Sequence, residues 1–406
     1  MLSSARGLIA TIPEQDISVP TANWSYPTAV RFGAGCIKDL AEACRAAGIG
    51  RPLLVTDAGL AKLAITATAV GLLKEAGLPV AVFSDVQSNP VESNVEAGIA
   101  AFRKGNHDGV IAFGGGSGLD TGKVIAFMAG QTRPLWDFED IGDWWTRADA
   151  DTIAPIVAVP TTAGTGSEVG RAGVITQAAT HTKKVIFHPK MMPRMVICDP
   201  ELTAGMPPSI TMGTGMDALA HCFEAYCAPS YHPMAEGIAV EGTRLIFANL
   251  PKAVANGKDL EARAHMMSAA AMGAAAFQKG LGAIHALSHP VGALYNTHHG
   301  TTNGVFMPYV LVFNRAAIEP KIARLAGFLG ITGGFDGFLK AVLDLRKQTG
   351  VPHALGGLGV DRGKVETIVE MSLVDPTAGG NPVPLTKEGS RKIFDAALSG
   401  DVAAAA

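Results

Sequence analysis

The sequence has few cysteines, and none of them is spaced for a metal site or a redox pair. Among its 406 residues, the cysteines are Cys36, Cys44, Cys198, Cys222 and Cys227, and no CxxC motif occurs. The odd number and the spacing argue against a disulfide framework and against a zinc site made of thiolates. We interpret these residues as small buried apolar side chains in a reducing compartment.

Neither sign of charge dominates the chain. Lys and Arg number 33 and Asp and Glu number 36, which leaves a formal net charge of −3. A protein without excess positive charge is a poor partner for nucleic acid or an anionic membrane surface, so we expect neither. The hydrophobic fraction of 48% and the charged fraction of 17% exclude a largely disordered chain.

Long apolar runs are also missing, although the mean hydropathy is positive at +0.25. The most apolar stretches, residues 109–113, 153–159 and 269–277, are far shorter than the roughly 20 residues of a membrane-spanning helix. Residues 1–16 lack the basic segment and long apolar segment of a secretory signal. We therefore expect a cytoplasmic protein with no membrane span.

The first half of the chain alternates short apolar runs with longer helical patterns. Unbroken apolar strands separated by helices indicate a parallel sheet that is covered on both faces. Three further short strands, at 174–175, 185–187 and 195–197, are interpreted as a small antiparallel addition. The predicted sheet strands are residues 52–56, 80–83, 109–113 and 153–159, and the predicted helices are 61–76, 91–103 and 118–129.

After Pro207 and Pro208 the pattern changes to long segments rich in Ala, Met and Leu, which predict an all-helical second half. The boundary lies near residues 203–208, so we divide the chain into residues 1–204 and 205–406. The clearest helical segments are 211–226, 235–250, 262–277 and 335–348.

A glycine-rich turn, GGGSGLDTGK at residues 114–123, lies between a predicted strand and a predicted helix. Glycine lets the backbone approach a ligand closely, and the N-terminus of the following helix favours an anion such as a pyrophosphate. The spacing matches neither GxGxxG nor the Walker pattern, so a tight turn without a ligand is the alternative reading.

Two more segments support a nucleotide site. Asp57 ends an early strand, where a carboxylate can accept hydrogen bonds from ribose hydroxyls and repel a 2′-phosphate, which favours NAD over NADP. A helix cap is an equally good reading of Asp57. The segment PTTAGTGSE at residues 160–168 also follows a predicted strand, where parallel sheets bind their ligands.

Acidic and histidine side chains form three short clusters in the second half. Asp217 and His221 are one helical turn apart, and His285 and His289 repeat that spacing. His298 and His299 follow after ten residues. One carboxylate with several imidazoles suits a divalent ion such as Fe²⁺, Zn²⁺, Mn²⁺ or Ni²⁺, and the lack of thiolates disfavours structural zinc.

In combination, these motifs resemble the iron-containing (group III) alcohol dehydrogenases, which share a fold with glycerol dehydrogenase and dehydroquinate synthase. The resemblance extends from about residue 25 to 395 and includes DPELTAGMPP at 199–208, GMDALAH at 215–221 and the segment 282–299. It implies a Rossmann-like α/β dinucleotide-binding domain, an all-α metal-binding domain and an active site between them. It also implies a homodimer or a higher homo-oligomer.

The resemblance assigns roles to individual residues. It implies Fe²⁺ held by Asp217, His221, His285 and His299, with catalysis involving Asp217, His285 and His289. His289 would lie near the nicotinamide, where it relays a proton or only positions the cofactor. The implied NAD contacts are Asp57, Asn89, Gly115, Gly116, Ser117, Asp120, Thr161, Thr162, Thr165, Lys183 and His289, with Lys184 as an alternative to Lys183.

The predicted function is reversible oxidation of a small alcohol, diol or hydroxy acid, with the metal polarising the substrate oxygen. Two departures from the family pattern, Gly170–Arg171–Ala172 and His298, leave the substrate class open. A dehydroquinate synthase-type elimination and a non-catalytic binding protein are the alternatives. A metal-free reductase of the maleylacetate type is disfavoured because all four ligand positions are filled.

Overall fold

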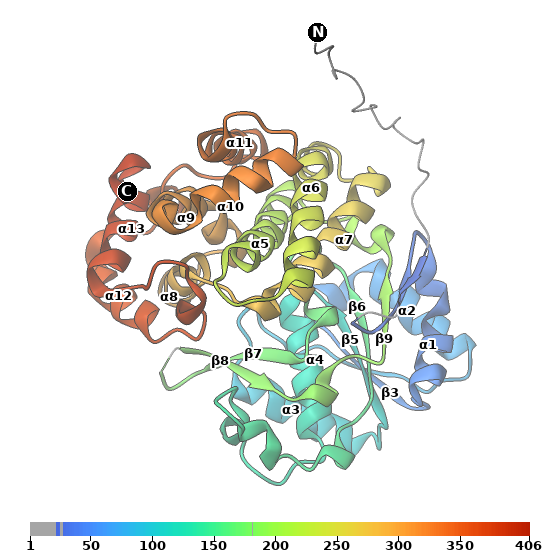
Figure 1. Ribbon diagram of the computed structural model, residues 1–406. Coiled ribbons are helices and arrows are strands. Elements are labelled where there is room, and N and C mark those ends of the chain that lie inside the picture. Colours follow the sequence, from blue (N-terminus) through green and yellow to red (C-terminus); the bar gives the residue numbers. More distant parts are fainter. Residues whose placement is uncertain (1–21, 25–26, 181) are drawn as a thin grey trace.

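The computed structural model describes residues 22–24, 27–180 and 182–406, and it consists of a sheet-containing half and a helical half (Figure 1). The N-terminal residues that we used to argue against a signal peptide lie outside these ranges. None of the helices in the described ranges is long and apolar enough to cross a membrane.

In the described ranges, six strands run parallel in the central sheet, and a seventh, β1 (Ala22–Trp24), is antiparallel at one edge. The Rossmann-like fold class is therefore confirmed. The strands follow the order β1, β2 (Ala29–Phe32), β9 (Met195–Cys198), β6 (Ile156–Pro160), β5 (Gly109–Gly114), β3 (Pro52–Val55) and β4 (Ala81–Phe83).

Side chains alternate between the two faces of this sheet and enter two different apolar clusters. In β5, Val110 and Ala112 pack into the larger cluster, whereas Ile111 and Phe113 pack into the smaller one. This alternation is the two-residue period of a strand buried on both faces. Helices α1 (Leu40–Ala47) and α2 (Ala64–Glu75) line the smaller cluster, and α3 (Glu92–Lys104) and α4 (Gly116–Met128) line the larger one.

One strand assignment was wrong. We expected 195–197 to join a small antiparallel addition, but β9 lies inside the parallel sheet, where it pairs with β2 and β6. The antiparallel addition is instead a single hairpin of β7 (Ala172–Gln177) and β8 (Thr182–Phe187). The strand predicted from residue 153 starts later, because a short 3-10 helix covers Ala150–Thr152 and Pro155 precedes β6.

Residues 205–406 are all described, and they contain helices but no strand, so the all-helical expectation is confirmed. Helices α5, α6 and α7 pack together, and α8, α9 and α10 also contact α5 (Figure 1). The helices are α5 (Pro208–Cys227), α6 (Pro233–Ala255), α7 (Leu260–Ala276), α8 (Ala283–Tyr295), α9 (His299–Phe313), α10 (Arg315–Phe328), α11 (Gly334–Thr349), α12 (Val365–Leu373) and α13 (Lys387–Ser399).

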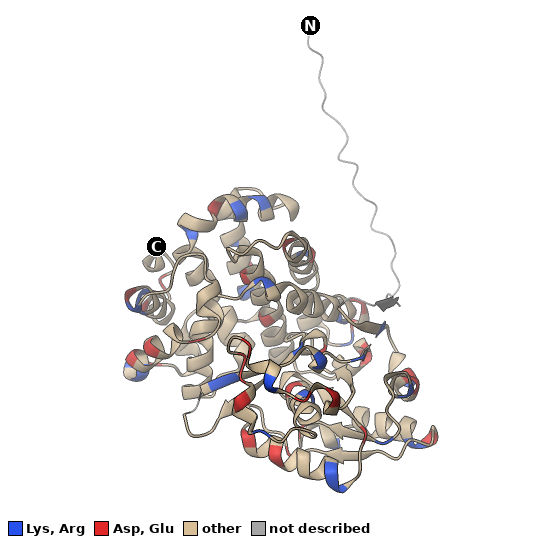
Figure 2. Cartoon of the chain, turned by 60° about the horizontal axis from the view of Figure 1, so that its bottom comes forward, with Lys and Arg blue, Asp and Glu red and all other residues tan. Residues whose placement is uncertain are grey.

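In the cartoon of Figure 2, charged residues of both signs are interspersed along the chain. This distribution agrees with the near-neutral composition. All five cysteines are buried and free, as expected for small apolar side chains.

Candidate active site

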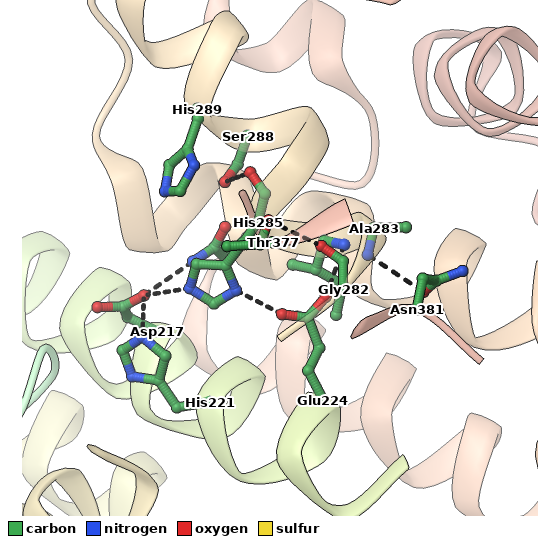
Figure 3. A network of polar contacts seen from close by, with 12 residues as sticks. Asp217, His221, Glu224, Gly282, Ala283, His285, Ser288, His289, Thr377 and Asn381 are labelled. Carbon is green, nitrogen blue, oxygen red and sulfur yellow. Dashed lines mark hydrogen bonds and ion pairs between the residues drawn. The ribbon is translucent and has the colours of Figure 1, made fainter. Parts of the chain in front are cut away.

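The predicted metal ligands come together from three helices. Asp217 and His221 lie one turn apart on α5, His285 lies in the first turn of α8, and His299 begins α9. The Oδ1 atom of Asp217 is 3.8 Å from Nε2 of His221, 3.7 Å from Nε2 of His285 and 3.4 Å from Nε2 of His299. Figure 3 shows the side chains of His221 and His285 directed at Asp217.

These distances match a single coordination sphere. Ligand atoms about 2.1 Å from a tetrahedral ion are roughly 3.4 Å from one another. Asp217, His221 and His285 present ligand atoms that all lie within 4.8 Å of one another, and all three residues are buried. The donor set of one carboxylate and imidazole nitrogens therefore fits a divalent transition metal.

The fourth ligand position depends on a close approach of α5 and α9. A Cβ atom on Gly300 would lie 2.0 Å from the backbone oxygen of Gly213, so only glycine allows the two helices to approach so closely. His298, the departure from the family pattern, is the N-cap of α9 and accepts a hydrogen bond from the backbone N–H of Thr301 at 3.3 Å. Its side chain thereby fixes the start of the helix that carries His299.

The pKa values of the buried histidines His221 and His285 are shifted in opposite directions. Burial lowers the pKa of His221 to about 4. Burial also acts to lower the pKa of His285, but the carboxylates of Glu224 and Asp217 outweigh it and raise the value to about 9. Burial would raise the pKa of Asp217, yet the three surrounding imidazoles hold it well below its usual range. The carboxylate of Asp217 is therefore ionised and available as a ligand.

Two acidic residues that contact the predicted site histidines were not assigned a role from the sequence. Glu224 contacts Nδ1 of His285 at 2.5 Å, and Asp375 contacts Nδ1 of His289 at 2.8 Å. Glu224 could have been found, because it is seven residues after Asp217 and so lies on the same helix face. Asp375 offered no such signal, because it is 86 residues from its partner.

Asn303 is a third residue that we missed. Its Nδ2 atom donates to Oδ1 of Asp217 at 2.8 Å and lies 3.2 Å from Nε2 of His285 and 3.3 Å from Nε2 of His299. Asn303 lies one turn after His299 on α9, so the same i, i+4 reasoning that found the other pairs applies to it.

On the sheet side, the glycine turn and the threonine-rich segment lie against each other. β3, β5 and β6 are neighbours in the sheet, so the segments that follow them meet at one edge. A Cβ atom on Gly115 would be 3.1 Å from Thr162, and one on Gly116 would be 2.7 Å from Thr165. The backbone N–H of Thr161 donates to the Gly114 carbonyl at 2.9 Å.

Several predicted cofactor contacts also have partners inside the protein. The Ser117 hydroxyl donates to the carbonyl of Ser88, next to Asn89, at 2.6 Å. Asp120 accepts hydrogen bonds from the Ser167 hydroxyl and, at 3.1 Å, from the backbone N–H of Val174. Asp120 thus joins α4 to the β7–β8 hairpin, and its contact with a cofactor stays a prediction.

Asp57 adopts the capping geometry that we considered as its alternative role. Its Oδ1 atom accepts hydrogen bonds from the backbone N–H groups of Gly59 at 2.8 Å and Leu60 at 2.9 Å. A capping role for one oxygen does not occupy the other, so the ribose role stays a prediction.

The hairpin distinguishes the two candidate lysines. Lys184 forms an ion pair with Glu139 at 2.7 Å. Burial lowers the pKa of the Lys183 amine, and the charges of Asp217, Asp120 and Asp375 oppose this shift. Lys183 thus interacts electrostatically with acidic groups of both halves, and its contact with a cofactor stays a prediction.

Comparison with known proteins decides the family. The model of the iron-containing alcohol dehydrogenases matches residues 27–200, and that of their C-terminal region matches residues 211–398. The chain belongs to the iron-containing alcohol dehydrogenase family. This membership confirms the predicted resemblance.

Members of this family cover nearly the whole chain. A 4-hydroxybutyrate dehydrogenase from Cupriavidus necator is 38% identical over 92% of this chain and 99% of its own length. An NAD-dependent methanol dehydrogenase from Bacillus methanolicus is 34% identical over 93% and 100%. The crystal structure of a 1,3-propanediol oxidoreductase superposes with a TM-score of 0.86 at 36% identity, covering 94% of this chain and 100% of its own.

Proposed function

We propose that the protein is a metal-dependent, NAD-linked alcohol dehydrogenase that interconverts small alcohols and their aldehydes. One observation carries the proposal: three histidine nitrogens lie 3.4 to 3.8 Å from Asp217 Oδ1, so that four ligand atoms from three helices are spaced for one divalent ion. The ligands would be Asp217, His221, His285 and His299, and Fe²⁺ is the expected ion, with Zn²⁺, Mn²⁺ and Ni²⁺ as alternatives.

An ion held there would supply Lewis-acid chemistry to the oxygen of the alcohol or aldehyde. The side chain of His299 is 28% exposed, whereas those of Asp217 and His285 are 4% and 2% exposed. Substrate therefore approaches from the side of His299. The ring of His289 stacks on His299 with centroids 5.3 Å apart, which places His289 on this open side.

His289 is suited to hold or move the hydroxyl proton. Its Nδ1 atom contacts Asp375, and Asp375 in turn accepts hydrogen bonds from the backbone N–H and the hydroxyl of Thr377 at 2.9 and 2.6 Å. A histidine whose Nδ1 is held by a carboxylate exchanges protons through Nε2.

The nucleotide would bind across the carboxyl edge of the sheet. The backbone of Gly115 and Gly116 and the side chain of Ser117 at the N-terminus of α4 suit the pyrophosphate. Its further contacts would be Thr161, Thr162, Thr165, Asn89 and Asp120. Asp57 would select NAD over NADP through the ribose. Lys183 and His289 would lie beside the nicotinamide half, because β8, which carries Lys183, contacts α8, which carries His289.

The names of the three relatives described above, with 4-hydroxybutyrate, methanol and 1,3-propanediol, support a small substrate that has at most one further polar group. We further propose a cytoplasmic homodimer or higher homo-oligomer with domains at residues 1–204 and 205–406. Neither a dehydroquinate synthase-type elimination nor a non-catalytic role has comparable support among these relatives.

The test is NADH formation by chelator-treated protein that has been reloaded anaerobically with Fe²⁺. We expect absorbance at 340 nm to rise with short alcohols, diols or hydroxy acids, and the Asp217→Ala variant to lose this activity after the same treatment. Turnover without net NADH would favour the elimination reaction. Full activity of metal-stripped Asp217→Ala would refute the metal assignment.

A further inference from the structure

Glu224 is a buried carboxylate with no assigned role in the reaction. It lies on α5 two turns after Asp217, it is 4% exposed, and both of its oxygens are engaged at the start of α8 (Figure 3). Oε1 accepts a hydrogen bond from the backbone N–H of Ile284 at 2.7 Å, and Oε2 lies 2.5 Å from Nδ1 of His285.

This pairing fixes the tautomer of His285. A carboxylate only accepts hydrogen bonds, so Nδ1 carries a proton and donates it to Oε2. Nε2, which lies 3.7 Å from Asp217 Oδ1, is then the ring nitrogen that would give up its proton and present its lone pair when a metal binds. A histidine that ligates a metal commonly has its other nitrogen bound to a carboxylate in this way.

We propose that Glu224 is a positioning residue that sets the affinity of the site for its metal. This inference rests on the metal site of the proposed function. Glu224 fixes the backbone of the first turn of α8 through Ile284 and the side-chain orientation of His285 through Nδ1.

The Glu224→Gln variant tests the hydrogen-bonding role of Glu224 with almost no change in side-chain shape. Glutamate presents two acceptors to two donors, whereas glutamine presents one acceptor and one NH₂ donor of nearly the same shape. If its oxygen stays on Ile284, the NH₂ group faces Nδ1 and moves the imidazole proton to Nε2, where the metal should bind. If the amide is reversed, two donors meet at Ile284.

Asn381 offers a matched control. Its Oδ1 atom accepts a hydrogen bond from the backbone N–H of Ala283 at 3.1 Å, so it also caps α8. Its other hydrogen bonds, to Asn314 and Val383, do not involve the metal ligands. Asn381→Ala therefore removes a helix cap but leaves the contact between Glu224 and His285 in place.

The experiment measures the affinity of the full-length protein for Zn²⁺ and Co²⁺ by competition with a chelator, together with the visible spectrum of the Co²⁺ form. We expect Glu224→Gln to bind both ions about 10- to 100-fold more weakly and to change the Co²⁺ spectrum. Glu224→Asp keeps a carboxylate with two acceptors on a side chain that is one methylene shorter. Its metal affinity should therefore lie between those of the wild type and Glu224→Gln. Asn381→Ala should bind metal nearly as well as the wild type.

Wild-type affinity in Glu224→Gln would overturn the inference, as would equal weakening by Glu224→Gln and Asn381→Ala, because the role would then be that of a helix cap alone. If Glu224→Gln fails to fold, the Glu224→Asp affinity decides: wild-type affinity there refutes the role. Wild-type protein that binds neither ion would instead overturn the metal site of the proposed function.

Discussion

At the scale of single residues, Asp57 combines a structural contact with a predicted choice of cofactor. Asp57→Asn keeps an acceptor at Oδ1 for the N–H groups of Gly59 and Leu60, but it removes the negative charge. We expect the ratio of kcat/KM for NADP to kcat/KM for NAD to rise about tenfold, because one repulsive contact of about 1.4 kcal/mol is lost. Steady-state kinetics with both cofactors measures this ratio.

Asp57→Ala is the comparison, because it also removes the acceptor and should lower the thermal stability of the protein. An unchanged cofactor ratio in Asp57→Asn would mean that the carboxylate serves the turn alone.

Site residues could be predicted from the sequence only where their partners lie close to them along the chain. Asp217 with His221 was visible from spacing, because both are on one helix. Their spacing did not distinguish the roles of His285 and His289. In the structure, His285 faces Asp217, whereas His289 pairs with Asp375. No local pattern contains that pairing, since it is made by packing between distant segments.

At the scale of elements, the errors came from local signals that tertiary packing overrides. Helices α8 and α9, which were not among the clearest predicted helical segments, each contain an internal proline, Pro290 and Pro308. β9 was placed in the wrong sheet, because its run of apolar residues is compatible with either sheet and the pairing with β2 and β6 is non-local. The alternation of strands and helices between β3 and β6, by contrast, was plain from residue type.

The short 3-10 helix Ser167–Val169, after the threonine-rich segment, carries a pH-sensitive carboxylate. Glu168 is 3% exposed, and burial raises its pKa from 4.5 to about 7, although the charge of Lys123 opposes this shift. The native protein therefore binds a proton that the unfolded chain releases above about pH 4.5. The stabilising contribution of this bound proton is fully present below pH 4.5 and is lost as the pH rises through 7.

We expect the Glu168→Gln variant not to lose this stability as the pH rises, because glutamine does not ionise. Relative to the wild type, its free energy of unfolding should increase between pH 5 and pH 8 by up to about 3 kcal/mol. Urea denaturation at each pH gives the difference, and Glu75→Gln, at an exposed position on α2, serves as the control. A difference that stays constant with pH would refute the buried-carboxylate explanation.

At the scale of the whole molecule, the two halves share one apolar core. The larger cluster of buried residues runs from Val30 in β2 through α4 and α5 to Ala405 near the C-terminus. Strand β8 of the hairpin also contacts α8 of the helical half. A metal that binds only the helical half should therefore stabilise the sheet half as well, because neither half can unfold without exposing the core that they share.

We expect calorimetry of the chelator-treated protein to show one unfolding transition, which moves to higher temperature as a whole when Zn²⁺ or Co²⁺ is added. At a free metal concentration of one hundred times Kd, the gain is about 2.7 kcal/mol. Asp217→Ala should show the same single transition but no shift with metal. Two transitions, of which only one responds to metal, would mean that the domains predicted at residues 1–204 and 205–406 unfold independently despite the continuous core.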